Sequence, residues 1–196
     1  THLSQYIKQI FAQVSNPPID PIRERSVMSL INYLGGNENV LDHKPEHARK
    51  IRIEDPLLSP SEFEFIRNAK FDEFSTEIIE ATYNPNQTDL QSAVKQLARQ
   101  AAACVVSGTS ILIISNKNIS PERVRIPSLM ATGAVHQYLL RKKLRAKTSL
   151  VVEAGDVVET HHFATLIGFG ATAIYPYLAI ETILHQGSGS KRSNKI

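Results

Sequence analysis

The residues of this chain best suited to chemistry are one carboxylate and two adjacent histidines. Glu153 follows the apolar run 150–152, and His161 and His162 lie a few residues further along the chain. A continuous apolar run is typical of a strand buried in a parallel sheet, and ligands of such sheets bind at the carboxyl ends of the strands. We therefore expect one imidazole to pack inward and hydrogen-bond Glu153. Glu153, His161 and His162 are the candidate polar site.

The two histidines are a weaker candidate for a metal centre. Neighbouring residues on a helix point about 100° apart, so His161 and His162 cannot both ligate one ion from that helix. The sequence offers no second Cys, His or Asp group at the spacing of metal ligands. We predict no catalytic set, no cofactor-binding residue and no metal ligand in this chain.

Three further features have both a functional and a plain structural interpretation. The segment 115–118 follows a second apolar run and could bind an anion, although a solvated loop is the simpler expectation. Gly155 lacks the glycine-rich neighbourhood of a phosphate-binding loop. Cys104, in an Ala/Val run, is expected to be a buried small hydrophobe. As the sole cysteine it excludes an internal disulfide and indicates a reducing compartment.

Composition sets the class of protein. The chain has 196 residues, 42% of them hydrophobic and 21% charged, with a net charge of +3. These values are ordinary for a globular protein, and no apolar run reaches the roughly 20 residues that span a bilayer. Much of the positive charge lies in 141–147, where no aromatic residue is interleaved for base stacking. We predict neither a membrane nor a nucleic-acid partner; salt-dependent nucleic-acid binding through 141–147 is a third hypothesis.

The segment 74–186 has the pattern of repeated βα units. Gly108 and Gly170 each follow a helix, where a left-handed residue is expected. Buried strands separated by helices form parallel sheets, and four strands are too few for a closed eight-stranded barrel. The predicted fold class is α/β, a partial (β/α) barrel-like parallel sheet preceded by an N-terminal helical, proline-rich segment. The expected strands are 75–83, 110–114, 148–152 and 173–175, and the expected helices are 89–106, 127–143 and 158–168.

The lead segment, residues 1–73, combines helical patterns with prolines. Helices are predicted over 1–14, over 22–34 with a stop at Gly35-Gly36, and over 61–68 after Ser59-Pro60. Between the first two, Pro17, Pro18 and Pro21 form a rigid, non-helical strut. The last residues, 187–196, are rich in Gly, Ser and Lys, and we expect a flexible tail or a remnant of cloning.

Several ordered blocks of sequence carry a family resemblance. With the proline-rich segment 14–24, they resemble the central domain of the large chain of glutamate synthase, from about residue 3 to about residue 182. Two blocks depart from the family: 115–118 reads Ser-Asn-Lys-Asn where relatives commonly read Ser-Asp-Arg-Gly, and 175–178 reads Tyr-Pro-Tyr-Leu where they read Asn-Pro-Tyr-Leu. The matching blocks are Glu46–Arg49, Ile126–His136, Thr148–Glu153, His161–Ala164, Gly168–Ala171 and Tyr175–Ala179.

The resemblance implies a function for the whole enzyme and a role for this part. The family makes L-glutamate from L-glutamine and 2-oxoglutarate, using an amidohydrolase domain and a synthase domain with FMN and an iron–sulfur cluster. The resemblance implies that this chain, which holds neither cofactor, docks those two domains of the same polypeptide and walls the ammonia path between them. Thr1 is not a natural start, so we expect a piece of a longer protein. The residues implied at the interdomain or channel surface are Asn16, Pro17, Pro18, Asp20, Pro21 and Arg23.

Two expectations complete the hypothesis. The protein should be cytoplasmic, or in the plastid stroma if it comes from a photosynthetic eukaryote, and an isolated fragment is able to form a homodimer through exposed apolar surface. The alternative from another class is an independent half-barrel enzyme for a small molecule, using Glu153 with His161 or His162. An effect of Glu153→Ala on a ligand bound by this chain alone would favour the alternative.

Overall fold

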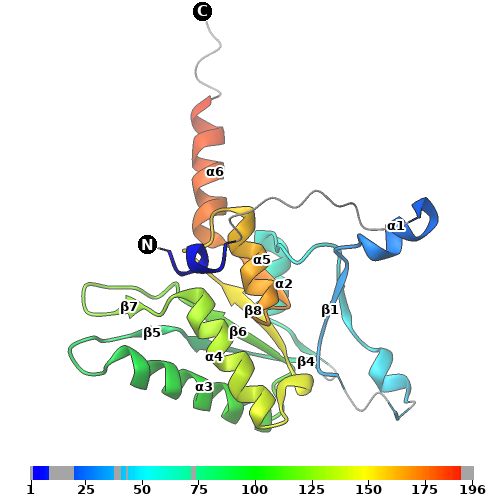
Figure 1. Ribbon diagram of the computed structural model, residues 1–196, viewed down its shortest axis with the longest axis horizontal. Coiled ribbons are helices and arrows are strands. Elements are labelled where there is room, and N and C mark those ends of the chain that lie inside the picture. The colour runs from blue at the N-terminus through cyan, green and yellow to red at the C-terminus, as the bar shows by residue number, and fades with distance from the viewer. Residues whose placement is uncertain (1, 9–19, 38–40, 43, 72–73, 191–196) are drawn as a thin grey trace, which may run out of the picture.

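The computed structural model describes residues 2–8, 20–37, 41–42, 44–71 and 74–190. They form a mixed α/β structure around a five-stranded sheet (Figure 1). Four neighbouring strands run parallel, and the strand at one edge is antiparallel to its neighbour. In spatial order the strands are β3 (Lys70–Phe71), β4 (Phe74–Glu80), β6 (Ile111–Ser115), β8 (Ser149–Glu153) and β9 (Ala173–Tyr175).

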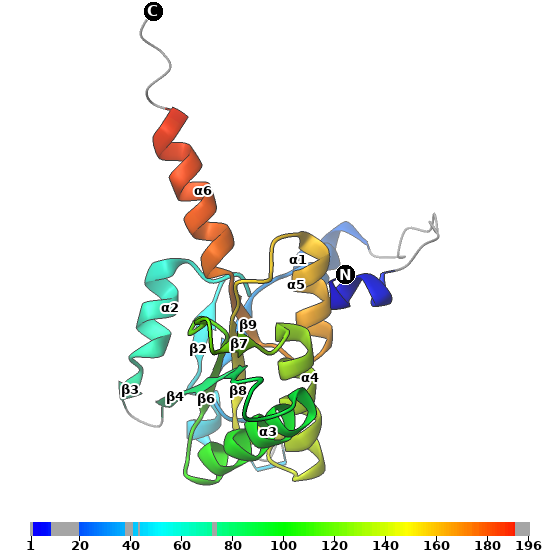
Figure 2. The same cartoon turned by 90° about the vertical axis from the view of Figure 1, so that its left-hand side faces the viewer.

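The two central strands confirm the prediction made from their apolar runs. Every residue of β6 and of β8 is buried. They pair in register, with Ile111 opposite Ser149 and Ile113 opposite Val151. Because successive side chains point to opposite faces, strands of this composition need a cover on both faces of the sheet. Figure 2 shows helices on the two sides of the sheet.

One face is covered by helices α3 (Leu90–Val106), α4 (Ser128–Arg141) and α5 (Thr160–Gly168). The apolar stripe of α3 packs with that of α4 against strand residues such as Leu112 and Leu150. A neighbouring cluster joins α5 to β8 and β9. All three helices were expected from the sequence, and their bounds differ from the expected ones by only a few residues.

The opposite face is covered by α2 (Pro60–Arg67) and by an antiparallel ribbon of β1 (Asn32–Leu34) and β2 (Ile51–Ile53). Leu34, Ile53 and Phe63 are buried there against the sheet. Helix α2 begins as predicted: the Ser59 side chain accepts a hydrogen bond from the Glu62 backbone, and the Glu62 carboxylate accepts one from the Ser59 backbone. This capping box satisfies two backbone donors that a helix N-terminus leaves free.

The predicted helix 22–34 is wrong. Helix α1 (Pro21–Val27) ends after two turns, and the last three residues of the predicted helix form β1. The expected inward stripe does not form, because Ile22 is 91% exposed while Leu34 is fully buried. Pairing with β2 and burial of Leu34 outweigh a weak helical pattern, as tertiary context commonly does. Of the predicted helix 1–14, the described part is a 3₁₀ helix, η1 (Leu3–Ile7).

Smaller elements connect these layers. The predicted strand 75–83 is split, because β4 ends at Glu80 and β5 (Thr82–Tyr83) leaves the sheet to pair with β7 (Val124–Arg125). The second strand of this ribbon, β7, is not among the strands predicted from the sequence. Two short 3₁₀ helices are η2 (Pro45–Ala48) and η3 (Arg145–Lys147).

The C-terminal part differs from expectation. Helix α6 (Tyr177–Ser190) follows β9 and projects from the body of the domain in both views (Figures 1 and 2). It includes 187–190, which were expected to belong to a flexible tail; 191–196 lie outside the described residues. Within the described chain the sheet is open, and the outer edge of β9 pairs with the segment 56–58 through the bridge Leu57–Ile174.

At the amino ends of the parallel strands, Arg145 joins three parts of the chain. Its guanidinium donates to the backbone carbonyls of Thr148 (2.6 Å) and Gly170 (2.8 Å) and to Nδ1 of His136 (3.0 Å). Gly170 has φ +111°, and Gly108 has φ +101°, which confirms the left-handed residues predicted after the two helices. A Cβ at Gly170 would lie 2.2 Å from His136 Nδ1, so only glycine fits there.

Candidate functional site

The last residues of the four parallel strands form a polar row across the sheet. Glu80 pairs with Ser115, Ser115 with Glu153, and Glu153 with Tyr175. Side chains alternate along a strand, so these four point to the same face, the one covered by α2. The carboxyl ends of parallel strands are the usual ligand-binding edge of an α/β sheet. We call Glu80, Ser115, Glu153 and Tyr175 the strand-end row.

Glu153 belongs to this row and lies at the strand end where the sequence placed it. The residue is 4% exposed, and its Oε2 accepts a 2.6 Å hydrogen bond from Ser115 Oγ. Its Oε1 is buried and accepts no hydrogen bond from any described residue. The Lys117 ammonium lies 3.8 Å from Oε1, which is beyond hydrogen-bonding distance. A buried carboxylate oxygen without a donor is costly, which makes this atom a candidate contact for a group that carries N–H or O–H donors.

Lys117 and Tyr177 form the wall beside Glu153. Lys117 is half exposed, and its Nζ lies 5.2 Å from the centre of the Tyr177 ring, a cation–π distance. Tyr177 is buried, and its hydroxyl would be 2.5 Å from a Cβ at Gly155, so the glycine admits the ring. Burial raises the pKa of Tyr177. The strand end therefore places one alkylammonium group between a carboxylate and an aromatic face.

Glu80, two strands away, resembles Glu153 in having one carboxylate oxygen with a hydrogen bond and one without. Its Oε1 accepts a 2.7 Å hydrogen bond from Asn118 Nδ2, and its Oε2 is buried without a hydrogen-bond partner in the part of the chain that the structure describes. At the other end of the row, Tyr175 stacks on Phe63 with ring centres 4.2 Å apart. Burial raises the pKa of Tyr175, and the charge of Glu153 adds to that effect. The row thus offers two buried acceptor oxygens that have no hydrogen-bond donor among the described residues.

The loops after β6 and β8 are tied together below the row. Asn116 is buried; its amide donates to Asp156 Oδ1 at 2.8 Å and accepts from the Gly155 backbone at 2.9 Å. The other oxygen of Asp156 accepts from the backbone of Ser128, at the start of α4 (3.0 Å). The expected solvated loop 115–118 is therefore only half correct, because its first two residues are buried and engaged.

The predicted pairing of Glu153 with a histidine is wrong. His162 is buried, as expected of one imidazole, but its Nδ1 accepts from the backbone N–H groups of Val158 and Glu159. Its Nε2 lies 3.2 Å from the carboxylate of Glu159. His161 hydrogen-bonds the backbone carbonyl of Ser4 through Nε2, at 2.9 Å. Both histidines belong to α5, which covers the face of the sheet opposite to Glu153.

His162 acts as part of a helix cap. Its ring stacks on that of His2 with centres 4.1 Å apart, and the backbone carbonyl of Asp156 binds the His2 ring (2.8 Å). Burial lowers the pKa of His162, and the positive charge of a protonated His2 would lower it further. These contacts dock η1 onto the start of α5. The histidines are accounted for by packing and capping.

Part of the predicted interdomain set is described, and its contacts are local. Asp20 caps α1, accepting from the backbone of Ile22 and of Arg23 at 3.0 Å each, and its carboxylate pairs with the Arg23 guanidinium. Pro21 is the first residue of that helix, a position that suits proline. Asn16, Pro17 and Pro18 lie outside the described residues.

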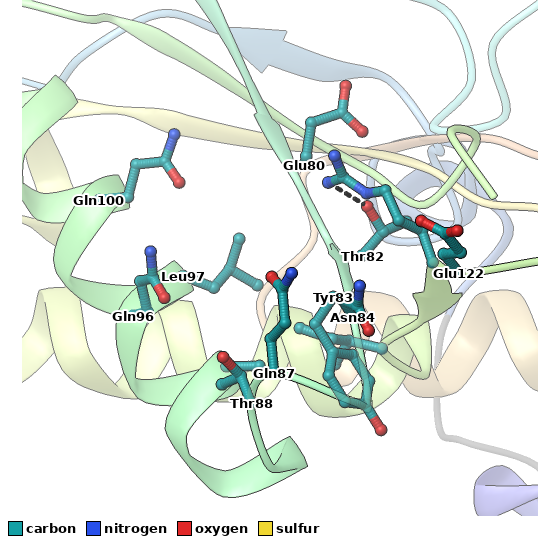
Figure 3. Close-up of a pocket in the computed structure, with 13 residues that line it drawn as sticks. Glu80, Thr82, Tyr83, Asn84, Gln87, Thr88, Gln96, Leu97, Gln100 and Glu122 are labelled. Carbon is teal, nitrogen blue, oxygen red and sulfur yellow. Dashed lines mark hydrogen bonds between the residues drawn. The ribbon is translucent and has the colours of Figure 1, made fainter. Parts of the chain in front are cut away.

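Sequence reasoning missed a pocket of about 390 Å³ between the start of α3 and the β5–β7 ribbon (Figure 3). Its lining is rich in side-chain amides, which come from Asn84, Gln87, Gln96 and Gln100. Glu80 lies at its edge, with the carboxylate directed away from these amides in Figure 3. The only signal in the sequence was the pair Gln96 and Gln100, four residues apart on one helix face. The pocket is open and its lining amides are neutral.

The described residues do not meet the requirements of a metal site, a reactive cysteine or a membrane-spanning helix. Among them, no group of three or more His, Cys, Asp or Glu side chains is arranged to hold a metal ion. Cys104 is partly buried against the first core cluster, and burial raises its pKa, which disfavours the reactive thiolate. No helix in the described chain is both long and apolar enough to cross a membrane.

Comparison with known proteins gives a consistent match. Residues 1–195 match the family model "Glutamate synthase central domain". The chain is 39% identical to glutamate synthase [NADH] of Schizosaccharomyces pombe over 92% of its length, which is 9% of that protein. It is 40% identical to ferredoxin-dependent glutamate synthase of Cyanidium caldarium over 98% of its length, which is 13% of that protein.

A bacterial relative has the same level of similarity. The chain is 41% identical to the large chain of glutamate synthase [NADPH] of Bacillus subtilis over 92% of its length, which is 12% of that protein. The chain therefore spans about a tenth of the length of the curated relatives it matches.

Proposed function

We propose that this chain, which belongs to the family of glutamate synthase central domains, is a docking and channel-forming part of an enzyme that makes L-glutamate from L-glutamine and 2-oxoglutarate. In this proposal the amidohydrolase and FMN synthase domains of the same polypeptide pack against it, and ammonia passes along it from one to the other. The FMN and the iron–sulfur cluster belong to the synthase domain. The open sheet would then serve as an incomplete barrel whose strand ends are covered by those neighbours.

The observation that carries the proposal is that Oε1 of the buried Glu153 accepts no hydrogen bond from any described residue. A buried acceptor without a donor is costly to stability, so a purely structural role as a spacer between domains does not explain it. Ammonia and ammonium both carry N–H donors, so a buried carboxylate oxygen is a suitable contact for them. Glu80 supplies a second such oxygen in the same strand-end row.

The contacts of Lys117 support the proposal that the surroundings of Glu153 Oε1 suit an ammonium group. The chain itself places an alkylammonium near Oε1, at 3.8 Å, and against the face of Tyr177. Carboxylate and aromatic face together are the surroundings that stabilise such a cation. Because Lys117 is half exposed and not hydrogen-bonded to Glu153, a small N–H donor could take the closer position. We propose that the strand-end row walls the ammonia path.

The test is Glu153→Gln in the intact enzyme, with three readouts: glutamine consumed, glutamate made, and ammonia released into solution. We expect glutaminase to persist, and glutamate made per glutamine consumed to fall about ten-fold, since one charge-assisted hydrogen bond contributes about 1.5 kcal/mol. The missing nitrogen should appear as free ammonia. Glu77→Gln, at an exposed glutamate on β4, is the matched control. An unchanged ratio in Glu153→Gln would reject the strand-end row as the wall of the path.

The proline-rich segment remains part of the proposal. Asn16, Pro17, Pro18, Asp20, Pro21 and Arg23 are proposed to lie at an interdomain surface, on the strength of the family resemblance. The alternative, an independent half-barrel enzyme, depended on Glu153 acting with His161 or His162. Since those histidines lie on the other face of the sheet and have other partners, no observation favours that alternative.

A further inference from the structure

Helices α3 and α4 lie side by side on the surface of the domain (Figure 1). A groove of about 370 Å³ is lined by residues of both helices. Its floor consists of small or apolar residues, including Val94, Ala98 and Ala134. Three cationic side chains line it: Lys95 and Arg99, one turn apart on α3, and Arg141 at the end of α4. We call these nine residues the α3–α4 groove: Val94, Lys95, Ala98, Arg99, Gly133, Ala134, Gln137, Tyr138 and Arg141.

The groove carries positive charge that no salt bridge among the described residues neutralises. Neither α3 nor α4 contains an Asp or a Glu. Lys95, Arg99 and Arg141 are exposed, and among the described residues the structure gives none of them a salt bridge. Asp89, the acidic residue just before α3, is engaged in capping that helix through Ser92. Uncompensated cations around an apolar floor are complementary to an acidic partner with an apolar face.

The shape of the groove favours a helix over a nucleic acid. Small floor residues let side chains of a second helix enter between α3 and α4, as in ridges-into-grooves packing. The lining contains one aromatic residue, Tyr138, whose ring lies 5.7 Å from the Lys142 ammonium. Single-stranded nucleic acid is bound by several aromatic rings in series along a basic surface, which this groove does not provide.

We propose that the α3–α4 groove docks an acidic amphipathic helix from another domain of the same polypeptide. This inference rests on the proposed function, because it takes the occupant from the enzyme of which this chain is a part. The relatives supply the reason: the chain spans 9–13% of their length, so most of each polypeptide lies outside this domain. The groove adds a specific docking surface, remote from the strand-end row on the opposite face of the sheet.

The test is zero-length carbodiimide cross-linking of the purified intact enzyme, followed by mass spectrometry. This reagent joins a lysine amine to a carboxylate only when they are in contact. We expect Lys95 to be joined to an Asp or Glu outside residues 1–196 of the same polypeptide, with apolar residues one turn away from that carboxylate. Mixing ¹⁵N-labelled with unlabelled enzyme separates links within one chain from links between two copies. Lys70, exposed on the edge strand β3, is the reference lysine.

Charge variants sharpen the test while leaving Lys95 in place. Arg99→Glu with Arg141→Glu should lower the yield of the Lys95 link at least about five-fold, since like charges then face each other. Arg99→Lys with Arg141→Lys should preserve it, and Lys70→Glu should not affect it. All these side chains are exposed, so matching far-UV circular dichroism spectra are expected.

The remaining outcomes contradict the inference. Links of Lys95 only between copies would make the groove a self-association surface. Steep, salt-dependent binding of a single-stranded oligonucleotide, with no Lys95 link, would make it a nucleic-acid surface. The absence of a Lys95 link under conditions that modify Lys70 would leave it without a partner. In each case the ratio measured for Glu153→Gln is unaffected, so failure of the groove and failure of the proposed function are distinguishable.

Discussion

The two ends of the parallel sheet differ in whether their charged side chain has all its hydrogen-bond partners. At the amino ends, Arg145 donates to two backbone carbonyls and to His136, and so joins the starts of β8 and β9 to α4. At the carboxyl ends, Glu153 is more deeply buried, yet one of its oxygens has no donor among the described residues. A satisfied buried network fixes a fold, whereas an unsatisfied buried group points to a function outside the isolated domain. Mutations should separate these two roles.

The largest effect is expected from Gly170→Ala, which places a Cβ 2.2 Å from His136 Nδ1. The backbone there has φ +111°, so strain and clash add, and we expect the free energy of unfolding to fall by about 3–4 kcal/mol. Gly108→Ala is the matched control. Its φ is +101°, but nothing lies within 4 Å of the added Cβ, so only the backbone cost of about 1–2 kcal/mol applies. Urea unfolding of both variants measures the difference, and equal losses would show that the His136 contact is unimportant.

Next in size is Arg145→Ala, which removes all three hydrogen bonds at the amino ends. We expect a loss of about 2–3 kcal/mol, because the carbonyls of Thr148 and Gly170 lose a charged donor. Lys147→Ala, at an exposed neighbour in η3, should change stability by less than about 0.5 kcal/mol. Chemical denaturation of the two variants makes the comparison. A loss below about 1 kcal/mol for Arg145→Ala would mean that water replaces the guanidinium without cost.

Much of the fold follows from local sequence, and the failures have a physical cause. The continuous apolar runs of β6 and β8 and the Ser59–Glu62 capping box are signals that can be read within a few consecutive residues. The helix predicted over 22–34 failed because β1 is held by pairing with β2, which lies about twenty residues further along. Sequence periodicity in a short segment does not report such a partner.

The candidate site shows the same limit at the level of single residues. Glu153 was correctly placed at a strand end. The face to which it points depends on whether it occupies an odd or an even position along the strand. Val152 packs towards α5, the helix that carries the histidines, whereas Val151 and Glu153 point towards α2. A shift of one residue reverses the face of a strand side chain. Without the sheet register, the sequence could not distinguish a histidine partner from Ser115.

A small effect on stability is expected from Glu153→Gln, in contrast to Arg145→Ala. The substitution weakens the bond from Ser115 but also removes a buried charge whose second oxygen has no hydrogen bond. These contributions oppose each other, so the free energy of unfolding should stay within about 1 kcal/mol of the parent value. Thermal and urea unfolding at neutral pH test this. A loss above about 2 kcal/mol would mean that the Glu153–Lys117 pair is a structural ion pair, and the contrast with Arg145 would disappear.

The smallest expected effect is the dependence of stability on pH near the amino ends. Burial lowers the pKa of His136, and the nearby Arg145 guanidinium lowers it further. The folded state then binds this proton more weakly than the unfolded state, so the contribution to stability is present above about pH 6.5, the ordinary histidine pKa. It is lost as the pH falls below that value and through the depressed pKa of the folded state.

His162, whose pKa burial also lowers, contributes with the same sign. We expect His136→Asn to reduce the slope of unfolding free energy against pH between about 6.5 and 5, since asparagine can still accept from Arg145 but does not titrate. His162→Asn should reduce the remaining slope. Urea titrations at several pH values provide the slopes. If His136→Asn leaves the slope unchanged, then the imidazole already titrates as in water, and Arg145 holds the amino ends through the two carbonyls alone.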